Sequence, residues 1–422
     1  MKYNKTILDN GLRVITVPMK DSPTVTVFVL VEAGSKYEDK GNNGISHFLE
    51  HMCFKGTVKR PSNSDISTEL DNIGSRYNAF TSQEYTGYYA KAQYAHIDKL
   101  LDIVSDMYLN PLFDEKEIEK EKGVIIEEIN MYEDLPQYKV QNLITELVYG
   151  DQPAGWEITG PKENIKNIAK KDFLTYRNKF YVAQATTVIV AGNFAEEKTI
   201  DNIQHIFSVM PKVEKGSKEK VREAQTKPEV ALFKKETDQT HLVLGVRTFN
   251  AYDKRDKIMT VLVGVLNAGM SSRLFKKLRD EMGVCYYVSA SQDALTDHGF
   301  FSVSAGVDSS RVKEVITVVL GELNKLKTEL VPQVELQKVK QNLVGTMYLG
   351  LESSDSLAKF YGGQEIMNEV IKTPEEIKAE IESITSEQVM CLAQEIFIDK
   401  SLNLAIVGRF TDKAKFVDIL KF

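Results

Sequence analysis

Apolar and polar residues alternate with different periods along this chain, and each period predicts one type of element. Short apolar runs bounded by turn residues predict strands at 12–17, 24–32, 75–82, 85–92, 241–248 and 299–307. Apolar residues at helical spacing predict helices at 96–109, 115–133, 258–266, 272–282 and 310–325. Helices therefore interleave with mostly antiparallel strands, and we expect an α+β fold.

A highly charged stretch with few apolar residues, 211–228, interrupts this pattern. Such a composition is typical of a linker. We therefore expect one α+β domain at 1–210 and a second at 229–422.

The two halves resemble each other. Residues 165–194 align without a gap against 381–410, and in both copies a polar helix precedes an apolar strand that ends in glycine. The alignment pairs Ile168 with Ile384, Gly192 with Gly408 and Phe194 with Phe410. This predicts a duplicated domain, each copy a mostly antiparallel sheet packed with helices.

Composition excludes some classes of protein. The chain is 42% apolar and 27% charged, as in ordinary globular proteins, and its net charge of -7 argues against nucleic-acid binding. No apolar run approaches the roughly 20 residues that cross a bilayer, so we expect no membrane association. The three cysteines are isolated in sequence and the first residues lack an apolar signal segment, which favours the cytoplasm.

The strongest chemical motif lies at 44–56, GISHFLEHMCFKG, where His47 and His51 are one helical turn apart and Glu50 lies beside them. Two histidines at this spacing can ligate one zinc ion, and the order H-x-x-E-H makes the glutamate a base rather than a ligand. Asn42 and Asn43 are expected to start this helix and Gly56 to end it. The alternative is a surface helix that carries two histidines by chance.

A third ligand is expected from the helix at 115–133. On this helix Glu121 and Glu128 lie two turns apart at the margin of the apolar face, whereas Glu127 points away. Glu128 is therefore the better ligand, and Glu121 could orient a ligand by a hydrogen bond. Solvated charge on an exposed helix is the competing interpretation.

HFLEHMCFKGT followed by EKGVIIEEINMYED resembles the pitrilysin and mitochondrial processing peptidase family of zinc metallopeptidases, particularly prokaryotic members of about this length. The resemblance implies that Glu128 binds zinc and that Glu121 supports the site. YNAFTSQEYTGYYAKA is similar to the family's substrate-binding hairpin, with the substrate edge at Asn78, Ala79, Phe80 and Thr81. SSRLFKKLRDEMGVCYYVSA resembles the segment that carries a catalytic arginine and tyrosine, which are Arg279 and Tyr286 here.

Two of these assignments have alternatives from the residues alone. Tyr286 could equally be a core aromatic beside Tyr287, and 78–81 could be an internal hairpin strand without a ligand.

The resemblance implies an endopeptidase with one Zn²⁺ per chain that hydrolyses peptides or unfolded, presequence-like segments, with Glu50 as general base. Chains of this length resemble half of a clamshell-like chamber. We therefore expect a homodimer whose sites are completed in trans, while a heterodimer with a metal-free homologue remains an alternative. A catalytically silent subunit of the same fold is the alternative function, but the intact residue set favours the enzyme.

Overall fold

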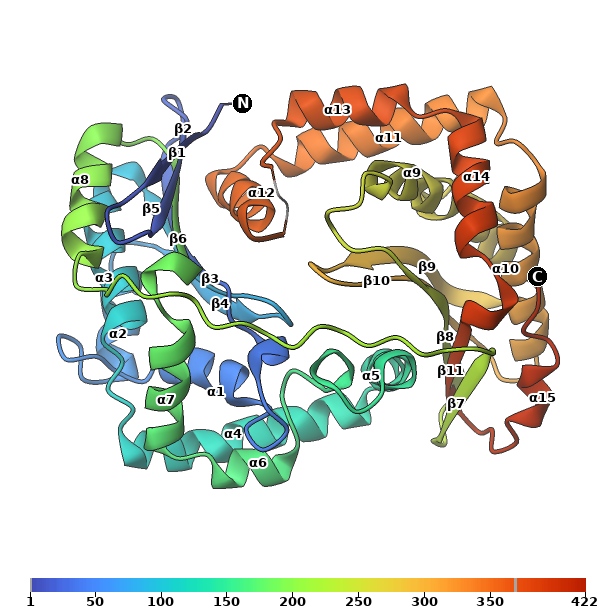
Figure 1. The fold of residues 1–422 in the computed structure, drawn as a ribbon, viewed down its shortest axis with the longest axis horizontal. Coiled ribbons are helices and arrows are strands. Elements are labelled where there is room, and N and C mark those ends of the chain that lie inside the picture. Colours follow the sequence, from blue (N-terminus) through green and yellow to red (C-terminus); the bar gives the residue numbers. More distant parts are fainter. Residues whose placement is uncertain (1, 368–369) are drawn as a thin grey trace. The chain divides into compact units, whose positions relative to one another are not determined.

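The computed structural model describes residues 2–367 and 370–422 (Figure 1). The chain forms two compact units. The first unit contains Met1–Ile129, Trp156–Glu219 and Gly350–Thr373, and the second contains Asn130–Gly155, Lys220–Leu349 and Pro374–Phe422. The α+β class with two sheets agrees with the expectation from the sequence.

The first unit is built on a six-stranded sheet in the order β1-β2-β6-β3-β5-β4. Neighbouring strands are antiparallel except β2 and β6, which are parallel. The strands are β1 (Asn4–Ile7), β2 (Arg13–Pro18), β3 (Thr24–Val31), β4 (Arg76–Thr81), β5 (Thr86–Gln93) and β6 (Thr186–Gly192). The helices of this unit are α1 (Ile45–Met52), α2 (Asn63–Asp71), α3 (Ile97–Leu109), most of α4 (Glu115–Asp134), α6 (Lys162–Asn167), α7 (Lys170–Phe180), α8 (Glu196–Phe207) and α12 (Ser354–Met367).

Both faces of this sheet are covered, because α3 and α8 lie on one side and α12 lies on the other (Figure 1). Alternate valines of β3 belong to the core on the α3 side. Thr26 on the opposite face shares a hydrogen bond with Ser354 of α12, with 2.9 Å between the two hydroxyl oxygens. The nearly continuous burial of β3 explains why its sequence alternates only weakly.

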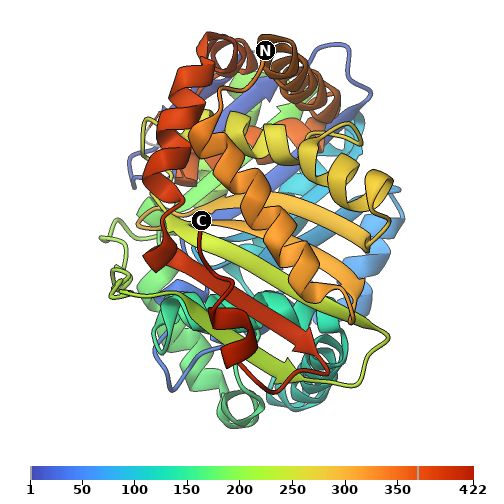
Figure 2. The ribbon, with the colours of Figure 1, turned by 90° about the vertical axis from the view of Figure 1, so that its right-hand side faces the viewer.

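The second unit repeats this topology in a five-stranded sheet, β7-β11-β8-β10-β9, in which only the β7–β11 pair is parallel. The strands are β7 (Glu229–Lys234), β8 (Gln239–Thr248), β9 (Cys285–Ala294), β10 (Gly299–Asp308) and β11 (Leu402–Gly408). Figure 2 looks onto the sheet face that α10 and α14 cover. The helices of this unit are α5 (Pro136–Tyr149), α9 (Asp256–Asn267), α10 (Val312–Thr328), most of α11 (Gln333–Gly350), α13 (Pro374–Ser383), α14 (Ser386–Ile396) and α15 (Ala414–Val417).

The predicted duplication agrees with this topology. Helix α7 matches α14 and strand β6 matches β11. In both pairs the residue numbers differ by the same amount at the start and at the end of the element, as in the sequence alignment. In both sheets the matched strand lies between an antiparallel and a parallel neighbour.

Each unit also contains a helix from the other half of the sequence. Helix α12 packs on β2, β3 and β6 in the first unit, and α5 packs on β7, β8 and β11 in the second. Under α5 lie Val243, Ala405 and Val407, so this face of the second sheet is also buried. The compact units therefore differ in these two segments from a simple division at the charged linker.

Most predicted elements are present with shifted ends, but 272–282 is not a regular α-helix. Its central part, Phe275–Glu281, forms a π-helical turn, η5. Within the described residues, no helix has the length and apolar character needed to cross a membrane.

Two adjacent glycines of α12 allow a test of its contact with the sheet. A Cβ at Gly362 would lie 2.8 Å from Leu30 Cδ1 and 3.1 Å from Ile189 Cδ1, whereas a Cβ at Gly363 would have no atom within 4 Å. We expect Gly362→Val to destabilise the protein by about 1–3 kcal/mol more than Gly363→Val, because only the first overpacks a buried contact. Urea unfolding of both variants measures this difference, and equal midpoints would contradict the packing of α12 on this sheet.

Candidate functional site

Helix α1 presents one apolar face and one polar face, as its sequence predicts. Ile45, Phe48, Leu49 and Met52 are each at most 1% exposed and belong to the core of the first unit. The opposite side carries His47, Glu50 and His51. Burial of the apolar face therefore fixes the direction in which the polar side chains project.

The start of α1 differs from the prediction. Gly44, with φ 102°, precedes the helix, and neither Asn42 nor Asn43 is its N-cap. Instead, the buried Glu38 carboxylate accepts hydrogen bonds from the backbone N–H groups of Gly44 and Ser46, at 2.8 and 2.7 Å. A side chain from the preceding loop thus satisfies N–H groups at the helix start. Burial raises the pKa of Glu38 to about 7, although these hydrogen bonds oppose the shift. Helix α1 ends at Met52, well before Gly56.

Three side chains of the first unit converge on one point. Nε2 of His47 and Nε2 of His51 each lie 3.7 Å from Oε2 of Glu128, and one ligand atom from each residue lies within 4.8 Å of the others. Two ligands bound tetrahedrally at about 2.0–2.1 Å would be roughly 3.4 Å apart. The spacing of these donors therefore fits a single metal ion with three protein ligands.

Glu121 holds one of the histidines. Its Oε1 lies 2.8 Å from Nδ1 of His51, and its Oε2 lies 2.5 Å from Nζ of Lys55. Burial raises the pKa of Glu121, but the contacts with His51 and Lys55 outweigh it and hold the pKa below its ordinary value. A carboxylate at Nδ1 leaves Nε2 of His51 as the metal-facing nitrogen.

The helical phase expected for α4 is confirmed, because Glu121 is buried and Glu128 is half-buried whereas Glu127 is exposed. Lys55, one turn after His51, is a member of the site that the sequence reasoning missed. Its position four residues after His51 was the available signal.

His47 is suited to metal binding as the neutral imidazole. Burial, aided by the nearby His51, lowers its pKa to about 3, although Glu121 opposes the shift. Its Nδ1 is buried without a hydrogen-bond partner among the described residues, in contrast to Nδ1 of His51.

Glu50 lies beside these donors, on the same face of α1. Thr81 Oγ1 donates a hydrogen bond of 2.6 Å to Glu50 Oε2. Burial raises the pKa of Glu50, and the hydrogen bond from Thr81 and the proximity of His51 oppose this shift. The carboxylate therefore lies in partly dehydrated surroundings, which favour proton uptake.

The predicted substrate strand is the edge strand β4, which among the described residues of the first unit pairs only with β5. Ala79 is buried, Asn78 is exposed, and Phe80 packs against Phe28 with ring centroids 6.0 Å apart. An unpaired edge of this kind can accept an added peptide strand.

Arg279 and Tyr286 belong to the second unit, on η5 and β9. Tyr286 is 77% exposed, so the alternative that it is a core aromatic is wrong. Tyr287 instead has the packed position, with its hydroxyl 3.1 Å from Nδ1 of His241. The Arg279 guanidinium lies over the Phe275 ring, 5.0 Å from its centroid.

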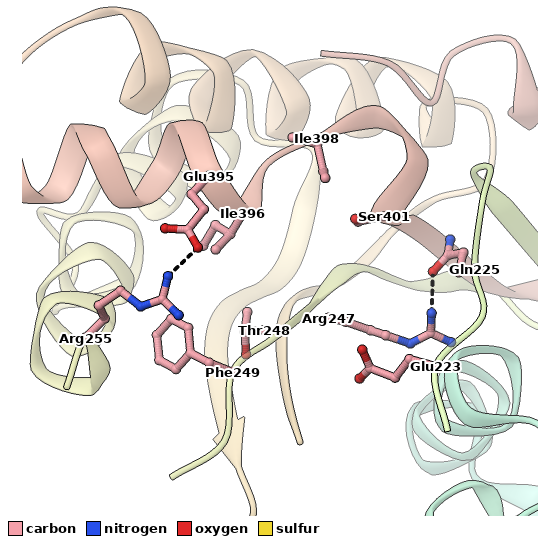
Figure 3. Close-up of a pocket in the computed structure, with 10 residues that line it drawn as sticks. All are labelled: Glu223, Gln225, Arg247, Thr248, Phe249, Arg255, Glu395, Ile396, Ile398 and Ser401. Carbon is pink, nitrogen blue, oxygen red and sulfur yellow. Dashed lines mark hydrogen bonds and ion pairs between the residues drawn. The ribbon is translucent and has the colours of Figure 1, made fainter. Parts of the chain in front are cut away.

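The second unit also contains a cavity of about 420 Å³, lined by charged and apolar side chains (Figure 3). Its two arginines are already paired: Arg255 contacts Asp253 and Glu395, and Arg247 donates to Gln225. None of the metal-donor residues lines it.

Comparison with known proteins identifies the family. The model of the family described as Insulinase (Peptidase family M16) matches residues 13–162, and that of the Peptidase M16 inactive domain matches 167–343. The chain is 34% identical to the uncharacterized zinc protease YmxG of Bacillus subtilis, over 92% of this chain and 94% of that protein. The chain belongs to peptidase family M16. An uncharacterized zinc protease of Rickettsia felis is 32% identical to this M16 chain, over 96% of this chain and 97% of that protein.

Two solved structures share the fold of this M16 chain. A protease from Helicobacter pylori has a TM-score of 0.89 at 23% identity and covers 96% of this chain and 99% of its own. A Peptidase M16 inactive domain from Pseudomonas fluorescens has a TM-score of 0.90 at 16% identity, and the match covers 97% of this chain and 99% of that one. The family models and the curated relatives confirm the resemblance to the pitrilysin and mitochondrial processing peptidase family.

Proposed function

We propose that this M16 chain is a zinc endopeptidase in which His47, His51 and Glu128 hold one Zn²⁺. The observation that carries the proposal is the convergence of these three donors beside Glu50. Relatives named zinc proteases support the choice of metal. A silent subunit of the same fold is the less favoured alternative, because the donors and the base are all present.

Bound zinc would lower the pKa of a water molecule to about 7 and polarise the scissile carbonyl. Glu50 would take a proton from this water at its carboxylate and later deliver the proton to the leaving amine. Glu121 would keep His51 in the tautomer whose Nε2 faces the metal.

The substrates that we propose are peptides and unfolded or presequence-like segments. Strand β4, with Asn78, Ala79, Phe80 and Thr81, would pair with the substrate backbone, because β4 is a sheet edge. We place the activity in the cytoplasm, since Cys53, Cys285 and Cys391 are all free.

We further propose a homodimer that encloses a chamber, in which Arg279 and Tyr286 of one chain stabilise the oxyanion at the site of the other. The high exposure of Tyr286 is consistent with a role completed by another surface. A heterodimer with a metal-free homologue is the alternative arrangement.

Alanine substitution tests the ligand set. We expect His47→Ala, His51→Ala and Glu128→Ala to lose zinc, and Glu121→Ala to weaken zinc binding about 10- to 100-fold, because it removes the support of His51. The matched control is Glu127→Ala, which changes an exposed neighbour and should keep full zinc content. Metal analysis after dialysis against a chelator measures each variant. Equal loss of zinc in Glu127→Ala and Glu128→Ala would show that the assignment of Glu128 as a ligand is wrong.

Replacing the base separates metal binding from chemistry. We expect Glu50→Gln to keep zinc and to lower kcat by roughly 10²- to 10⁴-fold, because the amide keeps the shape and cannot accept the proton. Digestion of a peptide library, with metal analysis of the same preparation, checks both parts. A zinc-loaded variant that cleaves at an appreciable fraction of the wild-type rate would refute Glu50 as the base.

Complementation tests the trans arrangement. One chain carries Glu50→Gln and the other carries Arg279→Ala with Tyr286→Phe, and each should be nearly inactive as a pure homodimer. In the isolated mixed dimer we expect one working site, which combines the intact Glu50 of one chain with the intact Arg279 and Tyr286 of the other. Peptidase activity of the doubly tagged dimer is measured, and no recovery would refute completion in trans while leaving the zinc chemistry intact.

A further inference from the structure

Thr81 differs in orientation from the strand residue before it. Side chains two positions apart on a strand share a face, so Thr81 and Ala79 point together toward one face, while Phe80 points toward the other. Helix α1 contacts β4. Across this contact Thr81 Oγ1 donates to Glu50 Oε2 at 2.6 Å, so its hydroxyl is directed at the proposed base.

The backbone around Thr81 is held from both sides. Thr81 pairs with Thr86 of β5, whose hydroxyl donates to the Ala33 carbonyl at 2.8 Å. The following turn accepts two backbone hydrogen bonds from the loop before α1, from Ser35 N to Ser82 O at 3.2 Å and from Lys36 N to Gln83 O at 2.8 Å. The position of the Thr81 hydroxyl is therefore set by the fold rather than by a mobile loop end.

The same turn contains a buried ionic cluster. Glu84 is 1% exposed, and its Oε1 lies 2.8 Å from Nζ of the buried Lys36 and also pairs with Lys218. Burial raises the pKa of Glu84, but the two lysines outweigh it and hold the pKa below its ordinary value. A cluster of this kind is costly to break by removing one partner, so it fixes the end of β4.

The close contact between the loop before α1 and the turn after Thr81 also depends on Gly34, which has no side chain. A Cβ at Gly34 would lie 2.3 Å from the Ser82 carbonyl oxygen. Any larger residue would push apart the loop that leads to α1 and the turn that follows Thr81.

From this geometry we propose that Thr81 is a positioning residue for Glu50, in addition to its place in the substrate strand. Its hydroxyl binds Oε2 and holds the carboxylate in one orientation, so that the other oxygen, Oε1, is the one presented for proton transfer. Thr81 is also the last residue of β4, the strand that would pair with the substrate backbone. Its position therefore links the placement of the substrate to the orientation of the Glu50 carboxylate. This inference rests on the proposed peptidase function.

Two substitutions at one position test the role. Thr81→Val keeps the shape and the strand preference of threonine but removes the donor, whereas Thr81→Ser keeps the donor. We expect the valine variant to lose roughly 10- to 100-fold in kcat, with KM and zinc content close to wild type, and the serine variant to recover most of the loss. Urea unfolding of both variants controls for stability, and Thr81→Ala replaces valine if the latter does not fold.

A double-mutant cycle tests whether Thr81 acts through Glu50. In the Glu50→Gln background we expect Thr81→Val to change the residual kcat less than about 2-fold, because its partner is already disabled. Equal kcat for the valine and serine variants, or an undiminished effect of valine in the Glu50→Gln background, would overturn the role of Thr81 alone. A zinc-loaded wild-type protein that cleaves no peptide would overturn the proposed function, and this inference with it.

Discussion

Helix α1 is held by the burial of Ile45, Phe48, Leu49 and Met52, and the candidate site depends on this burial. Each fully buried apolar side chain contributes about 1.5–3 kcal/mol, so a rotation of the helix that exposed all four would cost roughly 6–12 kcal/mol. Glu38 holds the start of the same helix, because its carboxylate accepts hydrogen bonds from the backbone N–H groups of Gly44 and Ser46. The two histidine donors and the proposed base therefore share one short helix, and Glu128 reaches them from a second helix, α4. Sites built on helices are positioned more precisely than sites on loops.

Burial of apolar surface also explains the positions of α5 and α12, each of which packs on the sheet of the unit formed mainly by the other half of the sequence. A sheet whose two faces are both apolar needs a helix on each side, and in each unit one of these helices comes from the other half of the sequence. Neither half of the chain supplies the full cover for its own sheet. The two units are thus alike in topology but not independent in sequence. The charged linker at 211–228 marks only one of the places where the chain passes between them.

The parts of the fold and site that follow local periodicity could be predicted from the sequence. The face of α1, the phase of α4 and the hairpin of β4 and β5 all depend on residue spacing, and the structure agrees with each. The parts that depend on contacts distant in sequence could not. Glu38 has no helix-capping spacing to α1, and α12 carries no sequence mark of the sheet on which it packs. The turn at Phe275–Glu281 adopts π-helical geometry that apolar periodicity does not distinguish from an α-helix.

The role of Thr81 could be predicted from the sequence only in part. Strand parity alone separates it from Phe80, so its face could have been deduced, but its partner could not, because Glu50 comes from a different element. The same distinction applies to the proposed chemistry. Metal donors and base are preorganised within the first unit by contacts that the folded chain already makes, whereas Arg279 and the exposed Tyr286 belong to the second. Metal binding should therefore be a property of the first unit itself. If Arg279 and Tyr286 of a second chain stabilise the developing oxyanion, as we propose, then catalysis, unlike metal binding, depends on assembly.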